Sequence, residues 1–279
     1  ASLPVLAPPP RQAARPALVA PPLPAPVPVR EAAVPQISRK LAVVIGNDAF
    51  IDDRIPWLDN AVHDADSVAR VLQTRLGYQT VVIHDATREA ILGALNRLAV
   101  QARPTDSVLV YYAGHGVVVD ATGMGYWIPS NANAELPKTW VSNNDIDRLI
   151  TRMRASQVVL VSDSCFSGSL VSSQSVTVSR SERTPSAFLG HRAALVMSSG
   201  GNEPVADGAI GGHSPFAQSL ITALGKVTQW EPGYDVFEQV RQDVTRQLPQ
   251  RPRYGPVRNG PYVQGADYLF EFRQLATAR

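Results

Sequence analysis

The sequence predicts an α/β protein with a mostly parallel six-stranded sheet flanked by helices, and three observations support that prediction. Short apolar runs alternate with stretches of helical periodicity, the order typical of parallel strands joined by crossover helices. Residues 107–112 and 157–161 are almost entirely apolar, as expected of strands buried on both faces. The 279 residues are 44% hydrophobic, which is enough for a core of that size.

Each element is expected for a local reason. Strands are expected where short apolar runs end at turn-forming or charged residues, at residues 41–46, 78–83, 107–112, 157–161, 193–198 and 268–270. Helices are expected where apolar residues recur every three or four positions, at residues 59–75, 87–98, 142–153, 215–224 and 236–247. Residues 117–119 and 126–128 flank a glycine-containing turn and predict a hairpin. The serine-rich stretch 169–191 predicts a mobile surface loop.

The first 38 residues differ in composition from the rest of the chain. Residues 1–37 hold 11 of the 23 prolines, and proline lacks the amide donor that helices and sheets use. We therefore expect residues 1–38 to form a disordered, semi-rigid linker or tether, with a PxxP-type ligand for a partner domain as the alternative. The folded domain is expected to span residues 39–273.

Charge and composition exclude several classes of protein. Residues 1–40 carry a net charge of +4 and the remainder −2, so the folded part lacks the basic surface that nucleic-acid binding needs. No apolar run approaches the roughly 18–20 residues that span a bilayer. The chain begins at Ala1 rather than Met, so we expect a trimmed N-terminus with no visible signal peptide, in either a cytoplasmic or an exported protein.

Two expected strand ends carry reactive side chains. Cys165, the only cysteine, follows the apolar run 157–161, and His115 stands between two glycines after the run 107–112. In open α/β sheets, ligands bind just beyond the carboxyl ends of the strands. If the two strands are neighbours, His115 can act as the base that converts Cys165 to a reactive thiolate. A buried cysteine that acts only as a small hydrophobe is the alternative.

Two motifs resemble those of a known enzyme family. Residues 111–116 read Tyr-Tyr-Ala-Gly-His-Gly, and residues 163–168 read Asp-Ser-Cys-Phe-Ser-Gly. Together they resemble the caspase-like cysteine peptidases (peptidase C14 type), closest to bacterial metacaspase-like proteins, the orthocaspases. His115 lies 50 residues before Cys165, which is the caspase spacing, although the caspase sequence Q-A-C-x-G is absent. Further resemblance in residues 58–65 and 212–216 extends it over about residues 40–271 and implies a caspase-like three-layer sandwich.

The resemblance implies a thiol protease that hydrolyses peptide bonds within protein chains. Cys165 would attack the carbonyl, His115 would protonate the leaving amine, and the N–H groups of Gly116 and Cys165 would stabilise the oxyanion. Asp64 and Asp163 match the acids that line the primary (S1) pocket of metacaspase-like enzymes, which implies cleavage after Arg or Lys. The alternatives are a solvated helix residue for Asp64 and a loop-capping carboxylate for Asp163.

The loop after Cys165 carries the residue type that such a pocket selects. Arg180 and Arg183 lie within residues 169–192, so autocatalytic cleavage after either arginine is expected. A passive loop whose arginines only aid solubility is the alternative.

No cofactor is expected to be required. Residues 143–147 carry oxygen ligands that suit weak Ca²⁺ binding, and metacaspases often need calcium. Ser130 and Ser172 stand where acids help in calcium-dependent relatives, so we favour Asp145 and Asp147 as helix N-terminal charges. The other histidines lack a glycine-flanked strand end and are not expected to be catalytic: His63, His84, His191 and His213.

Other functions are compatible with the same residues. A caspase-like signalling or binding module, recruited through the Pro-rich tail, would show little or no proteolysis. The thiol could also ligate peptides by acyl transfer. The expected partners are protein or peptide substrates with basic residues, and a protein that binds the tail.

Overall fold

A six-stranded sheet lies at the centre of the computed structural model, which describes residues 36–165, 167–172, 174, 176, 183–200, 212–260 and 262–273. The strand order is β10-β8-β7-β3-β1-β2, and every neighbouring pair is parallel except β10 with β8. The strands are β1 (Lys40–Gly46), β2 (Gln79–His84), β3 (Ser107–Ala113), β7 (Gln157–Asp163), β8 (Ala193–Ser198) and β10 (Arg253–Pro256). The expected mostly parallel sheet is confirmed.

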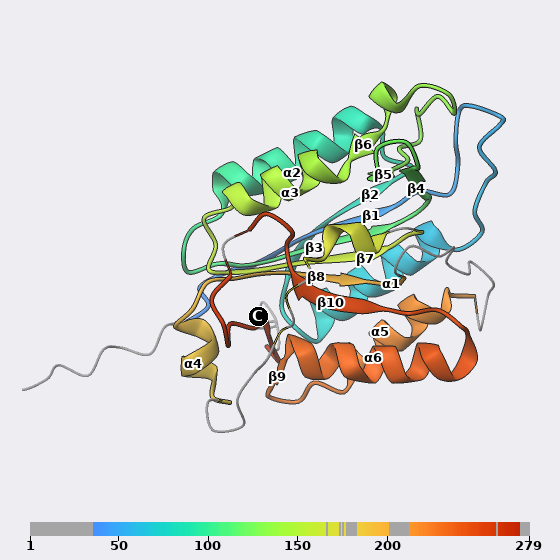
Figure 1. Cartoon of the computed structure of the whole chain (residues 1–279). Coiled ribbons are helices and arrows are strands. Elements are labelled where there is room, and N and C mark those ends of the chain that lie inside the picture. Colours follow the sequence, from blue (N-terminus) through green and yellow to red (C-terminus); the bar gives the residue numbers. More distant parts are fainter. Residues whose placement is uncertain are drawn as a thin grey trace, which may run out of the picture. The chain divides into compact units, whose positions relative to one another are not determined.

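Helices cover both faces of this sheet and give the domain three layers (Figure 1). One face carries α2 and α3, and the other carries α1, α5 and α6. The helices are α1 (Ala61–Thr74), α2 (Arg88–Gln101), α3 (Asn143–Arg152), α4 (Pro185–Leu189), α5 (Pro215–Gly225) and α6 (Gly233–Gln247), with 3₁₀ turns η1 (Pro137–Thr139) and η2 (Ser167–Leu170). Within the described ranges, no helix combines the length and apolar character needed to cross a bilayer.

The central strands are apolar at nearly every position because they serve two cores. On β1, Ala42 and Val44 enter the core shared with α1, α5 and α6. Val43 and Ile45 enter the core shared with α2 and α3. Successive strand side chains point to opposite faces, so a strand covered on both faces reads as a continuous apolar run.

Hydroxyl side chains cap the first turn of several helices. Thr87 Oγ1 accepts from Ala90 N at 3.2 Å at the start of α2. Ser214 Oγ accepts from Ala217 N at 2.9 Å at the start of α5. Each cap satisfies a backbone donor that has no partner within its own helix, which stabilises the helix by about 1 kcal/mol.

The strand expected at residues 268–270 belongs to a different sheet. It is β11 (Leu269–Glu271), which pairs antiparallel with β9 (Trp230–Pro232). The sixth strand of the central sheet is β10, whose sequence Arg-Tyr-Gly-Pro contains no apolar run. An edge strand accepts Gly and Pro because only one side of its backbone joins the ladder. The expected hairpin is present as β4 (Gly116–Val119) and β5 (Met124–Trp127), joined by β6 (Val141–Ser142).

The expectation that residues 169–191 form only a surface loop is wrong for the part that is described. Pro185–Leu189 forms α4, which begins at a Thr184 cap and buries Phe188. Val171 pairs antiparallel with Val257, and Ser172 N donates to Pro256 O at 2.9 Å. A segment that follows Cys165 therefore lies along the outer edge of β10. The Thr-Pro start of α4 is a helix signal that the serine content obscured.

Asp267, a buried carboxylate two residues before β11, has a shifted pKa. Asp267 Oδ1 accepts from Tyr254 Oη at 2.6 Å and from Tyr268 N at 2.8 Å, and Oδ2 accepts from Tyr234 N at 2.9 Å. Burial raises the pKa of Asp267 from 3.8 to about 6, although these hydrogen bonds lower it. The folded state therefore holds this proton more tightly than the unfolded chain does.

We predict that Asp267 makes stability fall as the pH rises from about 4 to about 6. In that window the folded state binds the proton and the unfolded chain does not, so the contribution of Asp267 to the free energy of unfolding drops, by roughly 3 kcal/mol in all. Urea unfolding of wild type and Asp267→Asn between pH 4 and 7 measures this. The difference between the two proteins should change with pH, and parallel curves would contradict the prediction.

Candidate active site

The carboxyl ends of β3 and β7 form the centre of the candidate site. The two strands are parallel neighbours, and their register sets Ala113 beside Asp163. The chain continues from β3 to His115 and from β7 to Cys165, and both residues line one cavity of about 110 Å³. The condition that the sequence left open, that these two strands are neighbours, is met.

His115 is held by two contacts from the loop between β1 and α1. Its Nε2 lies 2.8 Å from the carbonyl oxygen of Pro56. Its ring centroid lies 5.1 Å from that of Phe50. A carbonyl oxygen only accepts hydrogen bonds, so Nε2 carries the proton of the neutral ring. Nδ1 is then the nitrogen that can act as a base.

A buried tyrosine supports the backbone of His115 from the other side. Tyr112 Oη lies 3.0 Å from the carbonyl oxygen of His115 and 3.1 Å from that of Ile128, and both accept from the phenol. The Tyr112 ring stacks on Trp127 at a centroid distance of 4.1 Å. Burial raises the pKa of Tyr112 far above its ordinary value, so the phenol keeps the proton that it donates.

Gly116 lies against the backbone of Cys165. A Cβ at position 116 would overlap the carbonyl oxygen of Cys165 and would lie 3.2 Å from Ser164 Oγ. Only a residue without a Cβ lets the two backbones approach this closely. The two residues expected to supply oxyanion donors are therefore adjacent in space.

Two buried carboxylates line the same cavity. Asp64, in the first turn of α1, is 1% exposed, and Asp163, at the end of β7, is 7% exposed. Ser214 joins them, because its N–H donates to Asp64 Oδ2 at 3.1 Å and its hydroxyl donates to Asp163 Oδ2 at 2.6 Å. Asp64 is therefore not a solvated helix residue.

A histidine and a tyrosine lie beside these two carboxylates. His213 Nδ1 lies 2.5 Å from Asp64 Oδ1. Burial, and then the charge of Arg70, lowers the pKa of His213. Burial, and then Asp163 and Asp64, raises the pKa of Tyr111 well above 10.0, so this phenol stays protonated. A positively charged group is the ligand that fits such surroundings.

Sequence reasoning did not identify three contributors to this site. Ser214 and His213 lie in the stretch 212–216, where the family resemblance gave a signal without a role for either side chain. Pro56 contributes a backbone carbonyl oxygen, which every residue type carries, so no residue pattern could have indicated it.

Arg183, one of the two expected autocleavage residues, does not line this cavity. Arg183 precedes α4, and its Nη1 forms an ion pair with Asp235 Oδ2 on α6 at 2.8 Å. Arg180 lies outside the described residues.

The acids considered for calcium already have protein partners. Asp145 accepts from Ser142 Oγ at 2.8 Å and pairs with Arg148. Asp147 Oδ1 accepts from Asn259 N at 3.3 Å. Across the described residues, no group of three or more His, Cys, Asp or Glu side chains is arranged to hold a metal ion.

Comparison with known proteins identifies a family and two solved structures with a similar fold. Residues 39–258 match a family model described as a caspase domain, and a search of curated proteins gives no match. Caspase-1 from Spodoptera frugiperda is 19% identical, with a TM-score of 0.60 over 85% of this chain and 95% of that chain. Protein GSU0716 from Geobacter sulfurreducens is 16% identical, with a TM-score of 0.57 over 82% of this chain and 99% of that chain. Both structures share the fold.

We predict that Gly116→Ala destabilises the protein by about 1–3 kcal/mol, because the added methyl group would overlap the Cys165 backbone and must push the two motifs apart. Urea unfolding measures the change. Gly225→Ala is the matched control, since nothing lies within 4 Å of a Cβ at that helical position. If both variants unfold at the same urea concentration, the two backbones are not packed as described.

Proposed function

The chain belongs to the caspase-domain family, and from this premise we propose that it is a cysteine endopeptidase with a Cys165–His115 dyad. The observation that carries the proposal is the single cavity lined by Cys165, His115 and two buried carboxylates. The nucleophile, its base and a charged pocket are the parts that peptide hydrolysis requires.

The proposed reaction has two steps. In the first, the Cys165 thiolate bonds to the peptide carbonyl carbon, the C–N bond breaks, and the leaving amine takes a proton from His115 Nδ1. In the second, His115 accepts a proton from water, the hydroxide attacks the thioester, and the thiolate leaves. The N–H groups of Gly116 and Cys165 would stabilise the oxyanion in both steps. No metal takes part in either step.

We assign Asp64 and Asp163 to the pocket for the residue before the scissile bond. Both are buried and held by hydrogen bonds from Ser214. A guanidinium or ammonium group would restore charge balance and form charge-assisted hydrogen bonds, which supports cleavage after Arg or Lys.

The remaining assignments rest on sequence. The form Asp-Ser-Cys-Phe-Ser-Gly around Cys165 supports the bacterial metacaspase-like, or orthocaspase, subtype. The Pro-rich residues 1–38 are proposed as a tether and as a docking segment for a partner, outside a peptidase domain of residues 39–273.

We predict that purified protein hydrolyses fluorogenic peptides with Arg or Lys before the scissile bond at least about 100-fold faster than the same peptides with Asp, because a third acid in the pocket would be buried without a counter-charge. Cys165→Ala and His115→Ala should abolish hydrolysis. Asp163→Asn should lower kcat/KM for Arg peptides about tenfold or more, since a hydrogen bond to a charged group is lost.

Asp66→Asn is the matched control, because Asp66 lies two positions from Asp64 on α1 with its side chain 45% exposed. This variant should leave kcat/KM for Arg peptides unchanged. Turnover by Cys165→Ala would overturn the assigned nucleophile, and a preference for Asp would overturn the assigned pocket. Assays with Ca²⁺ and with chelator show whether calcium is needed. A protein that binds partners through its tail but cleaves no peptide would be a signalling module.

We also predict autocatalytic cleavage after Arg180 or Arg183. Arg183 must leave its ion pair with Asp235 to enter a pocket, so Asp235→Asn should speed cleavage at that residue. Intact-mass measurement of wild type, Cys165→Ala and the double variant Arg180→Gln/Arg183→Gln identifies the nick. Equal, unchanged masses for wild type and Cys165→Ala after long incubation would contradict the prediction.

A further inference from the structure

The contact that orients His115 comes from the backbone carbonyl of Pro56. The position of this carbonyl depends on what holds the loop of residues 47–60. Pro56 O accepts from His115 Nε2 at 2.8 Å. Phe50, from the same loop, packs beside the imidazole and inside a small core with Ile55 and Ile128. If this loop shifts, His115 loses both contacts together.

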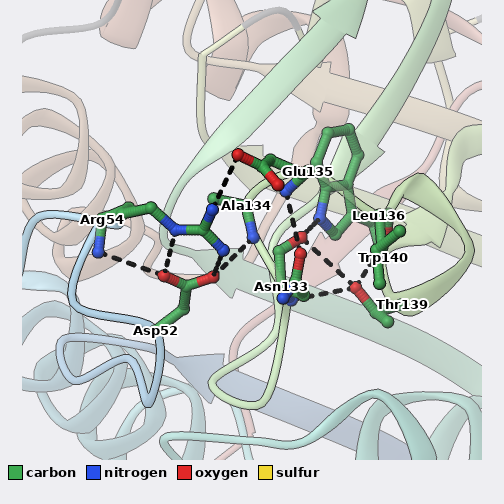
Figure 2. Close-up of polar contacts among 8 residues, drawn as sticks. All are labelled: Asp52, Arg54, Asn133, Ala134, Glu135, Leu136, Thr139 and Trp140. Carbon is green, nitrogen blue, oxygen red and sulfur yellow. Dashed lines mark hydrogen bonds and ion pairs between the residues drawn. The ribbon is translucent and has the colours of Figure 1, made fainter.

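The side chain of Asp52 ties this loop to the rest of the domain (Figure 2), and Ile51 N, in the same loop, also donates to Ser130 O at 2.9 Å. Its Oδ2 accepts from Ala134 N, across the loop boundary, at 2.8 Å. Its Oδ1 accepts from Arg54 N at 3.1 Å and from Arg54 Nε at 2.9 Å, and Oδ2 also accepts from Arg54 Nη2 at 2.7 Å. The side chain of Asp52 is only 10% exposed. One carboxylate thus binds both its own loop and a second segment.

The second segment, residues 133–140, is held by hydrogen bonds of its own. Asn133 O accepts from Trp140 Nε1 at 2.8 Å, and Asn133 N donates to Thr139 Oγ1 at 2.9 Å, so the turn is closed on itself (Figure 2). Trp140 O accepts from Arg88 Nε at 2.9 Å, which ties the turn to the first residue of α2. Asp52 therefore links the loop of residues 47–60 to a turn that contacts α2, a helix on one face of the sheet.

The ionic state of Asp52 suits this role. Hydrogen bonds from Arg54, and then from Ala134 N, hold the pKa of Asp52 well below its ordinary value. The carboxylate is therefore charged at any pH at which a cysteine peptidase works. Glu135 also pairs with Arg54, at 2.8 Å, but its side chain is 77% exposed, and exposed pairs contribute little.

We infer that Asp52 is a positioning residue for the dyad: by anchoring the 47–60 loop to Ala134, it places the Pro56 carbonyl oxygen on His115 Nε2 and leaves Nδ1 as the base for Cys165. The inference rests on the proposed cysteine peptidase function. Asp52 does not line the cavity that would bind the substrate. Replacing Asp52 should therefore leave that cavity unchanged.

The test compares Asp52→Ala with the neighbouring Asp53→Asn, whose exposed carboxylate is the matched control. With an Arg peptide, Asp52→Ala should lower kcat about 10- to 100-fold and leave KM within about twofold, because a small displacement of a catalytic group costs this much. Asp52→Asn, which keeps an oxygen for Ala134 N, should recover part of the rate.

Two readouts need no peptide and separate this inference from the proposed function. The ¹⁵N shifts of His115 should show an Nε2–H tautomer in wild type and in Asp53→Asn, and a mixture of tautomers in Asp52→Ala. The pH profile of Cys165 alkylation by iodoacetamide should move toward that of a free thiol only in the Asp52 variants.

Unchanged tautomer, alkylation profile and kcat in both Asp52 variants would overturn the inference. So would an Asp53→Asn effect equal to that of Asp52→Ala. If wild type cleaves no peptide and the tautomer still depends on Asp52, the proposed function fails while the positioning role stands.

Discussion

The parallel pairing of β3 with β7 is the constraint on which the site depends. Two strands in register end at the same level, so the residues that follow them are brought together without any contact specific to them. Gly116 then lets the backbones of both motifs touch. The sheet supplies the proximity of the thiol and the imidazole, and the loops supply only their orientation.

The sequence was informative where a residue's surroundings determine its type. A strand buried on both faces must be apolar throughout, so β1, β3, β7 and β8 could be recognised directly. β10 could not, because an edge strand that contains Gly255 and Pro256 has no such requirement, and its pairing with β8 depends on tertiary packing. The same reasoning explains why β11 was recognised as a strand although its partner could not be predicted.

The residues of the candidate site also differ in how far the sequence could indicate them. Cys165 and His115 could be proposed from residue type and position, and Asp64 and Asp163 from the family resemblance. Ser214 could be expected as a helix cap, yet its bonds to Asp64 and Asp163 exist only once α1, β7 and α5 converge. The Pro56 carbonyl has no sequence signature at all. A backbone group outside the recognised motifs, such as the Pro56 carbonyl, is thus revealed only by the folded structure.

The placement of residues 170–172 along β10 also determines how the sheet ends. Pro256 lacks an N–H, its carbonyl accepts from Ser172, and Arg258 N donates to Leu170 O. The chain itself therefore terminates the hydrogen-bond ladder on that side, which protects the edge against strand addition by another molecule. Because the segment that closes this edge begins a few residues after Cys165, a displacement of the chain near Cys165 would also unmask backbone groups of the sheet. Local opening near the thiol and exposure to intermolecular β-pairing are thereby coupled in this protein.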